Sequence, residues 1–194
     1  ITETVTKQVV SPIVLVDMLR FYTPDFSGAA GNTHFYTTDP KVEFIDGNEL
    51  RIEGVAWKMF PVGSTNIPTD AVPLYRLFSG GDHLYTISGA EKSSIQVSAQ
   101  TAGSKYLFEG IVGYVYSQPG PDREAVYRFY NPPGGLGGVG PVPGEHFYTT
   151  STDEIKTLAS QGYESEGIAF YTPTPPPAPL TPSSPNSPIQ VKKV

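Results

Sequence analysis

Short runs of aromatic and β-branched residues recur along the chain, each bounded by glycine, proline or other turn-forming residues. Near the C-terminus such runs cover residues 126–130, 145–150 and 166–171. Runs of four to six such residues between turn residues are typical of β-strands. We therefore predict a mainly β protein of short strands joined by loops.

The three runs occur three times in the same order. The middle copy has residues 74–78, 82–86 and 108–114, and the first has residues 18–22, 33–38 and 52–57. Three motifs that recur in one order are the signature of a repeat. We predict three divergent repeats, at about residues 15–60, 72–117 and 125–171.

A helix is predicted between the second and third strands of each repeat. In the last copy Ser151 and Glu154 form a capping box, and Gly162 follows as a stop. The equivalent start and stop residues of the other copies are Ser88 with Glu91 and Gly103, and Asp39 before Pro40 with Gly47. Each repeat is thus predicted to be β-β-α-β.

One such unit cannot bury its apolar face alone, but three around a pseudo-threefold axis can. We expect a closed array, because closure hides strand edges. A β-trefoil-like body and a three-bladed-propeller-like ring both fit the pattern. The array is predicted to form a single domain over residues 1–171, in which the apolar run 14–16 is a candidate added edge strand. Residues 172–194 are predicted to be an extended proline-rich tail.

Charge and composition exclude several classes of protein. The net charge is −6, and no basic stripe exists that could attract a phosphate backbone, so we expect no nucleic-acid partner. The sequence has no apolar run long enough to cross a membrane. It also has no cysteine, which excludes disulfides and thiolate chemistry. Because the chain begins with Ile1, we expect that a signal peptide or a sequence from expression was removed.

Each repeat carries the same three ionisable side chains, an arginine, a histidine and a glutamate. A catalytic centre needs one pre-organised site, so its residues have no reason to occur three times. We therefore predict no catalytic residue, no metal and no cofactor. A zinc site formed by the three histidines would require all of them to meet on the axis.

Two interpretations of these residues remain open. They are either a polar network that joins strands, with each Glu-Gly pair forming a bulge, or binding sites for a polar ligand such as a sugar. The single tryptophan is either a ligand contact or a core residue. The residues concerned are Arg20, His34, Tyr36, Glu53, Trp57, Arg76, His83, Tyr85, Glu109, Arg128, His146, Tyr148 and Glu166. The hairpin segments 23–32, 79–81 and 131–144 differ most between copies and are further candidates for recognition.

Residues 127–132, 146–150, 162–163 and 166–171 resemble a tandem repeat of unknown function. That repeat occurs in small secreted proteins of mushroom-type fungi, and as an accessory module of bacterial secreted hydrolases, including cell-wall lytic enzymes. The resemblance covers about residues 15–171 and implies an extracellular protein attached to carbohydrate or to a cell surface. The chain departs from the family pattern at Gly113, where an aromatic residue is usual, and at the long Gly/Pro segment of the third repeat. Any three sites are therefore expected to be unequal.

Together these observations predict a secreted, non-catalytic binding module whose partner is a glycan or a cell-surface polysaccharide. The alternatives are a structural or defence protein that acts by protein–protein contact, and a hydrolase of unrecognised type, because paired carboxylates leave no local signature.

Overall fold

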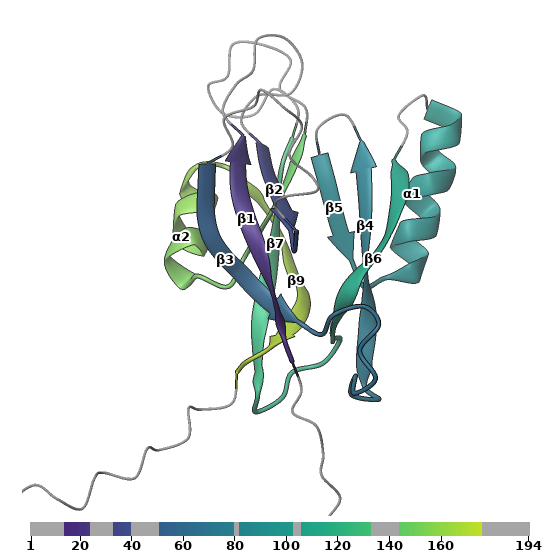
Figure 1. Ribbon diagram of the computed structural model, residues 1–194. Coiled ribbons are helices and arrows are strands. Elements are labelled where there is room, and N and C mark those ends of the chain that lie inside the picture. The colour runs from purple at the N-terminus through teal and green to yellow at the C-terminus, as the bar shows by residue number, and fades with distance from the viewer. Residues whose placement is uncertain are drawn as a thin grey trace, which may run out of the picture.

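The computed structural model describes residues 14–23, 33–39, 51–79, 82–102, 106–132 and 144–175, without the side chains of residues 97–102. This part of the chain is mainly β, as predicted, and its sheets curl into a half-barrel with two helices on opposite flanks (Figure 1). The elements are β1 (Val16–Thr23), β2 (Thr33–Thr37), β3 (Arg51–Met59), β4 (Ala71–Ser79), β5 (Asp82–Thr86), α1 (Gly89–Ala102), β6 (Leu107–Tyr116), β7 (Arg123–Asn131), β8 (Glu145–Thr149), α2 (Thr152–Ser160) and β9 (Glu164–Pro173).

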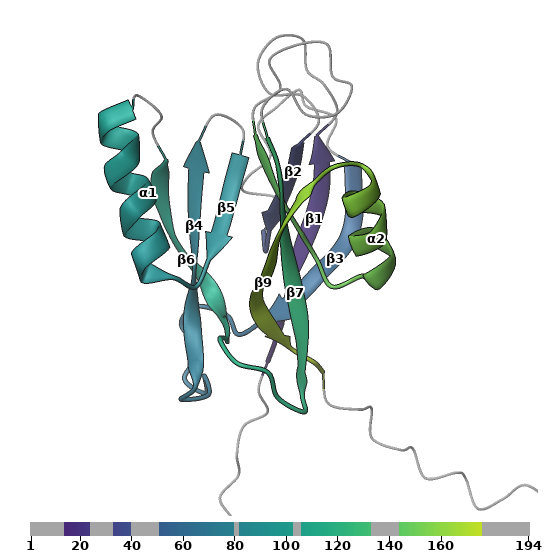
Figure 2. The ribbon, with the colours of Figure 1, turned by 180° about the vertical axis from the view of Figure 1, so that it is seen from behind.

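The strands group into three antiparallel units of three strands each. In unit 1 the order is β2-β1-β3, in unit 2 it is β5-β4-β6, and in unit 3 it is β8-β7-β9. The first strand of each unit lies between the other two. Units 2 and 3 form one six-stranded sheet because Tyr116 of β6 pairs with Tyr171 of β9. Figure 2 shows the same arrangement from behind, with α1 and α2 on opposite sides. Leu158 of α2 packs against Phe129 and Phe147 of unit 3.

Both helices begin where the capping residues predict. The Ser88 hydroxyl accepts a hydrogen bond from the Glu91 N–H at 3.1 Å, and the Ser151 hydroxyl accepts one from the Glu154 N–H at 3.3 Å. α2 ends at Ser160, just before Gly162, whose φ of 82° belongs to the left-handed region. The helices predicted in the second and third copies are thus confirmed, and the one predicted after Asp39 lies outside the described residues.

Each third strand contains a bulge at its Glu-Gly pair. Gly54, Gly110 and Gly167 have φ values of 125°, 136° and 85°, and the pairing register shifts beside each of them. A residue with a Cβ rarely adopts such values. The predicted bulges are therefore confirmed, and glycine is required there by the backbone.

Replacing Gly110 with alanine is expected to lower the free energy of unfolding by about 1–2 kcal/mol, the cost of a strained φ. A Cβ at this position would meet nothing within 4 Å, so the effect comes from the backbone alone. Gly89→Ala is the matched control, because Gly89 also has open space but starts a helix. Urea denaturation of both variants tests this, and equal stabilities would contradict it.

Aromatic side chains from all three units meet in the core. Tyr36, Tyr85 and Tyr148, one from each second strand, are fully buried with ring centroids 5.5–5.6 Å apart. The Tyr36 hydroxyl donates to the Tyr148 carbonyl, the Tyr148 hydroxyl to the Tyr85 carbonyl, and the Tyr85 hydroxyl to the Tyr36 carbonyl. This cycle of hydrogen bonds, at 3.1, 2.9 and 2.6 Å, ties the three units together at their centre.

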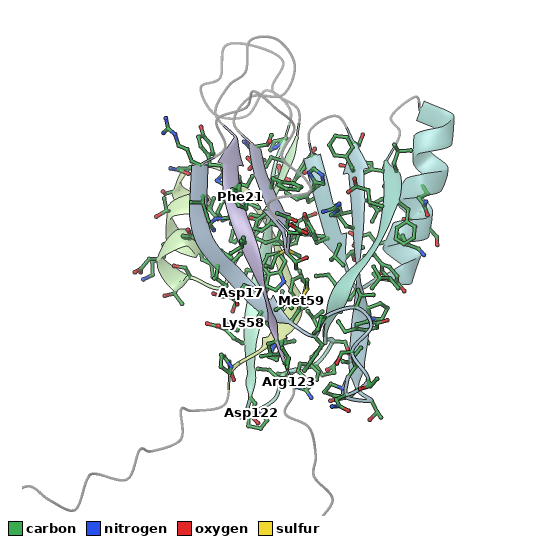
Figure 3. The ribbon with its side chains drawn as sticks, viewed as in Figure 1. Asp17, Phe21, Lys58, Met59, Asp122 and Arg123 are labelled. Carbon is green, nitrogen blue, oxygen red and sulfur yellow. The ribbon has the colours of Figure 1, made fainter. Side chains whose placement is uncertain are left out.

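The third strands also contact one another. Phe60, directly after β3, forms an antiparallel bridge with Tyr114 of β6. The Thr172 hydroxyl of β9 accepts a hydrogen bond from the Lys58 N–H of β3 at 3.1 Å. Figure 3 labels Lys58 and Met59 at this junction, and with the β6–β9 pairing every unit touches both others.

Two boundary predictions were wrong. β9 continues through Thr172 and Pro173, beyond the predicted start of the proline-rich tail, because both residues pair with β7. The apolar run 14–16 is not a separate edge strand, since only Val16 is extended and it belongs to β1. Residues 1–13 and 176–194 lie outside the described residues.

Candidate functional site

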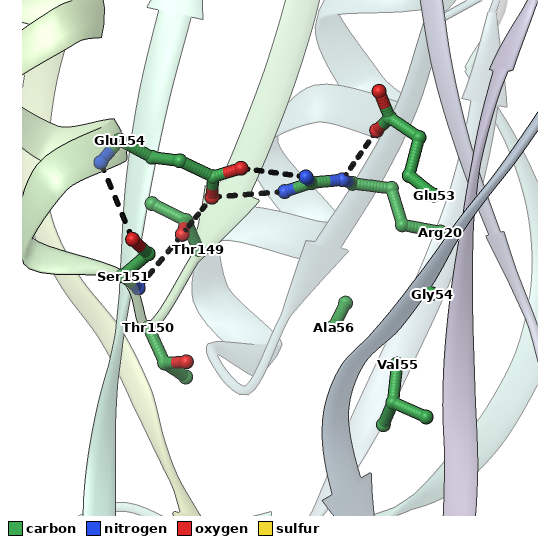
Figure 4. Close-up of a pocket in the computed structure, with 9 residues that line it drawn as sticks. All are labelled: Arg20, Glu53, Gly54, Val55, Ala56, Thr149, Thr150, Ser151 and Glu154. Atoms are coloured by element: carbon green, nitrogen blue, oxygen red, sulfur yellow. Dashed lines mark hydrogen bonds and ion pairs between the residues drawn. The ribbon is translucent and has the colours of Figure 1, made fainter.

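The repeated arginines lie at the interfaces between units. Arg20 of unit 1 reaches across to Glu154 in the first turn of α2, with N–O distances of 2.6 and 3.1 Å, and its Nε donates to Glu53 of its own unit at 2.6 Å. Figure 4 shows this fork of hydrogen bonds between the two carboxylates. A guanidinium held in this bidentate way is fixed in orientation.

The interface between units 2 and 3 repeats this arrangement. Arg128 binds Glu91 of α1 at 2.8 and 3.1 Å and Glu166 of its own β9 at 2.7 Å. The Arg20 hydrogen bonds hold the pKa of Glu154 below its ordinary value. Burial opposes ionisation of Glu91, but its hydrogen bonds with Arg128 and Thr86 and the charge of Arg128 together outweigh burial, so the pKa is again lowered.

At two interfaces the repeated histidine also contacts an acidic side chain of the neighbouring unit. His34 of unit 1 lies with its Nδ1 2.5 Å from Glu145 of unit 3, which also accepts the His34 N–H at 2.9 Å and the Tyr163 hydroxyl at 3.0 Å. His146 of unit 3 lies 2.6 Å from Asp82 of unit 2.

Asp82 has the same surroundings as Glu145. It accepts the His146 N–H at 2.8 Å and the Tyr106 hydroxyl at 2.7 Å. Both carboxylates are almost fully buried. Sequence reasoning missed them, although an acid directly before the histidine in two of the three copies was a signal.

The interface between units 1 and 2 differs from the other two. Its histidine is His83, and the position before the unit 1 histidine holds Thr33 in place of an acid. The His83 Nδ1 is buried without a hydrogen-bond partner among the described residues. Burial, reinforced by the charge of Arg76, lowers the pKa of His83 to about 4.

This shift predicts a loss of stability in mild acid. Between about pH 6.5, where an unfolded histidine titrates, and about pH 4, the unfolded chain binds a proton that folded His83 does not. Unfolding should therefore become easier as the pH falls through this range, by about 3 kcal/mol in total. The test compares His83→Asn with the unchanged protein by urea denaturation at several pH values, and a pH dependence retained in full by the variant would contradict it.

Clefts open at two of the interfaces and are lined by equivalent residues. Between units 1 and 3 a cleft of about 200 Å³ is lined by Arg20, Val55, Ala56 and residues 149–151, and the Arg20–Glu154 ion pair crosses it (Figure 4). Between units 1 and 2 a cleft of about 490 Å³ is lined by Arg76, Ile111, Val112, Val62 and residues 37–39. The larger cleft is the candidate binding site.

Burial of four of the candidate residues favours the structural interpretation over the binding one. Tyr36, Tyr85, Tyr148 and Trp57 are at most 3% exposed, so they are core residues and do not contact a ligand at the surface. Their large rings fill the space where the units meet.

The predicted contacts within each copy are present. In each one the arginine Nε lies 2.6–2.7 Å from the glutamate, and the histidine Nε2 lies 3.5–3.7 Å from it. The pairs are Arg20–Glu53, Arg76–Glu109 and Arg128–Glu166, with His34, His83 and His146.

Tyrosines rather than histidines meet where the three units come together. Within the described ranges no group of three His, Cys, Asp or Glu side chains is arranged to hold a metal ion. In the same part of the chain neither helix has the length and apolarity needed to cross a membrane. The hairpin segments 24–32, 80–81 and 133–143 are not described, so their role in recognition stays a prediction.

Comparison with known proteins adds a family but no activity. Neither the curated proteins nor the solved structures contain a match to this chain. A family model described as a domain of unknown function, DUF5648, matches residues 17–173, a range that extends from β1 to the end of β9. The chain therefore belongs to the DUF5648 family, which is consistent with the uncharacterised family expected from its motifs.

Proposed function

We propose that the three units are copies of one repeat, arranged as a closed pseudo-threefold array. The identical strand order, the three bulges and the cyclic hydrogen bonds of Tyr36, Tyr85 and Tyr148 support this. The mutual contacts of β2, β5 and β8 favour the propeller-like alternative, in which the inner strand of each blade lines the axis.

We further propose that the protein is a secreted, non-catalytic module that binds carbohydrate of a cell surface. The repeated ionisable residues bond to one another across and within the units, which favours a scaffold role for them. The observation that carries the proposal is the cleft of about 490 Å³, since sites for small ligands usually measure about 300–1,000 Å³. Its walls combine Arg76, Thr38 and Asp39 with the aliphatic Ile111 and Val62, and polar and apolar groups together can hold a sugar.

An array of fungal, bacterial and animal glycans tests this function. The full chain is expected to bind a subset of the array, and excess free glycan should compete for the same protein. An array without any bound glycan would overturn the proposal.

A second candidate is contact with another protein through the exposed apolar side chains of the third strands. Ile52 is 64% exposed, Leu107 60% and Phe108 41%. Apolar groups in such positions are typical of contact surfaces when they are contiguous. This alternative predicts that a pull-down captures one stoichiometric partner. That partner should be lost when Leu107 and Phe108 are both replaced by serine. The glycan array should show no binding.

A further inference from the structure

We infer that one interface of the three is the ligand site, and that it binds one neutral pyranose residue per protein between units 1 and 2. This inference rests on the proposed carbohydrate binding and adds its location, its stoichiometry and the class of sugar.

Size separates this cleft from its equivalent between units 1 and 3. The smaller cleft, of about 200 Å³, is below the usual range for a small ligand, and the bidentate pair of Arg20 and Glu154 spans it. The larger one, of about 490 Å³, falls inside that range. Of these two clefts, the larger one therefore has room for a sugar ring.

Several substitutions coincide at the interface between units 1 and 2. Thr33 stands where the other interfaces have Glu145 and Asp82, which leaves the His83 Nδ1 without a hydrogen-bond partner among the described residues. Asp39 stands where the other copies have serines, directly before the helices.

The aromatic position of the third strand differs as well. Gly113 replaces the large ring found at Trp57 and Phe170. Met59 fills that space, because a Cβ on Gly113 would approach its sulfur to 2.5 Å. Met59 and Gly113 together keep the core filled at this interface, whereas Thr33 and Asp39 change its polar groups.

The chemistry of the cleft fits a neutral sugar. The Asp39 carboxylate is an acceptor, Arg76 is a donor, and the Thr38 hydroxyl is both, so adjacent sugar hydroxyls find complementary groups. Ile111, which is 40% exposed, and Val62, which is 58% exposed, present an aliphatic wall to the C–H face of the ring. The Nε of Arg76 lies 2.7 Å from Glu109, so with Asp39 the cleft has no excess of positive charge to select an anion.

The test is a titration of the ¹⁵N-labelled full chain with the methyl glycosides of glucose, galactose, mannose and N-acetylglucosamine, followed by NMR. At least one glycoside should shift the amides of residues 37–39 and 111–112 and saturate at one per protein. Ile111→Asp and Asp39→Ser should each weaken that binding at least tenfold.

Matched controls come from the equivalent bulge positions. Val55→Asp and Ile168→Asp introduce the same charge beside Gly54 and Gly167, at side chains that are 52% and 45% exposed, and should leave binding unchanged. Thermal unfolding of all four variants identifies any that fail to fold. If Ile111→Asp does not fold, Asp39→Ser still tests the site, because serine is the residue at this position in the other two units.

Two results would overturn the inference while the proposed function stands. One is saturation at three sugars per protein, and the other is binding that Ile111→Asp and Ile168→Asp weaken equally. If no glycoside binds although the glycan array is positive, the single-pyranose site is wrong. If the array is also empty, the proposed function falls with it.

Discussion

Replacing Glu145 with alanine should lower the free energy of unfolding by about 3–5 kcal/mol. The carboxylate is 2% exposed and accepts hydrogen bonds from the His34 backbone N–H and the Tyr163 hydroxyl, with the His34 ring 2.5 Å away. Its removal leaves these groups buried without their acceptor and separates unit 1 from unit 3. Losing one partner of a buried polar network costs more than the net value of the network, because the remaining groups stay desolvated.

Urea denaturation measures this effect directly. Glu145→Gln keeps one acceptor oxygen and should be milder than Glu145→Ala. Glu164→Ala is the control, since Glu164 is an exposed carboxylate at the start of β9 and should change stability by less than about 0.5 kcal/mol. A loss below about 1 kcal/mol for Glu145→Ala would show that this carboxylate does not hold the interface.

The second large effect is expected for Tyr148→Phe, at about 3–5 kcal/mol. The Tyr148 hydroxyl accepts the Tyr85 N–H at 2.8 Å and donates to the Tyr85 carbonyl at 2.9 Å, and all three groups are buried. Phenylalanine fills the same space but leaves two backbone groups unsatisfied at the centre of the molecule. Each such group costs about 1–3 kcal/mol.

Equilibrium unfolding of Tyr148→Phe beside Tyr171→Phe tests this prediction. Tyr171 of β9 is only partly buried, so its hydroxyl has water available and its loss should be small. Tyr36→Phe and Tyr85→Phe should each resemble Tyr148→Phe. Equal stabilities of Tyr148→Phe and Tyr171→Phe would mean that the central hydroxyls contribute no more to the free energy of unfolding than a partly exposed one.

Local patterns in the sequence were sufficient to predict the strands, the two helix starts and the bulges. Ser88 and Ser151 are each followed three residues later by a glutamate, a pattern that predicts a helix start. The glycine of each Glu-Gly pair can adopt the positive φ that a bulge requires, so these pairs predict the bulges. The pairs Arg20–Glu53 and Arg128–Glu166 were also predictable, because these residues recur together in each repeat.

Contacts between units could not be predicted in the same way. Glu154 and Glu91 each donate a backbone N–H to the serine that caps their own helix. Nothing in the local sequence shows that their carboxylates bind Arg20 and Arg128 of a neighbouring unit. The alternation around Tyr148 shows which residues share its face, but not that the three such faces meet. Of the two interpretations of Trp57, its burial favours the core residue, and only the assembly of the units shows why.

The central claim is that ionisable residues present in every repeat hold the units together. A double-mutant cycle across the interface of units 2 and 3 tests it most directly, with Arg128→Ala, Glu91→Ala and the double variant measured by urea denaturation. The two side chains are 14% and 28% exposed and joined by two hydrogen bonds, so we predict a coupling energy of about 1–3 kcal/mol. Additive effects, with a coupling below about 0.5 kcal/mol, would contradict the claim.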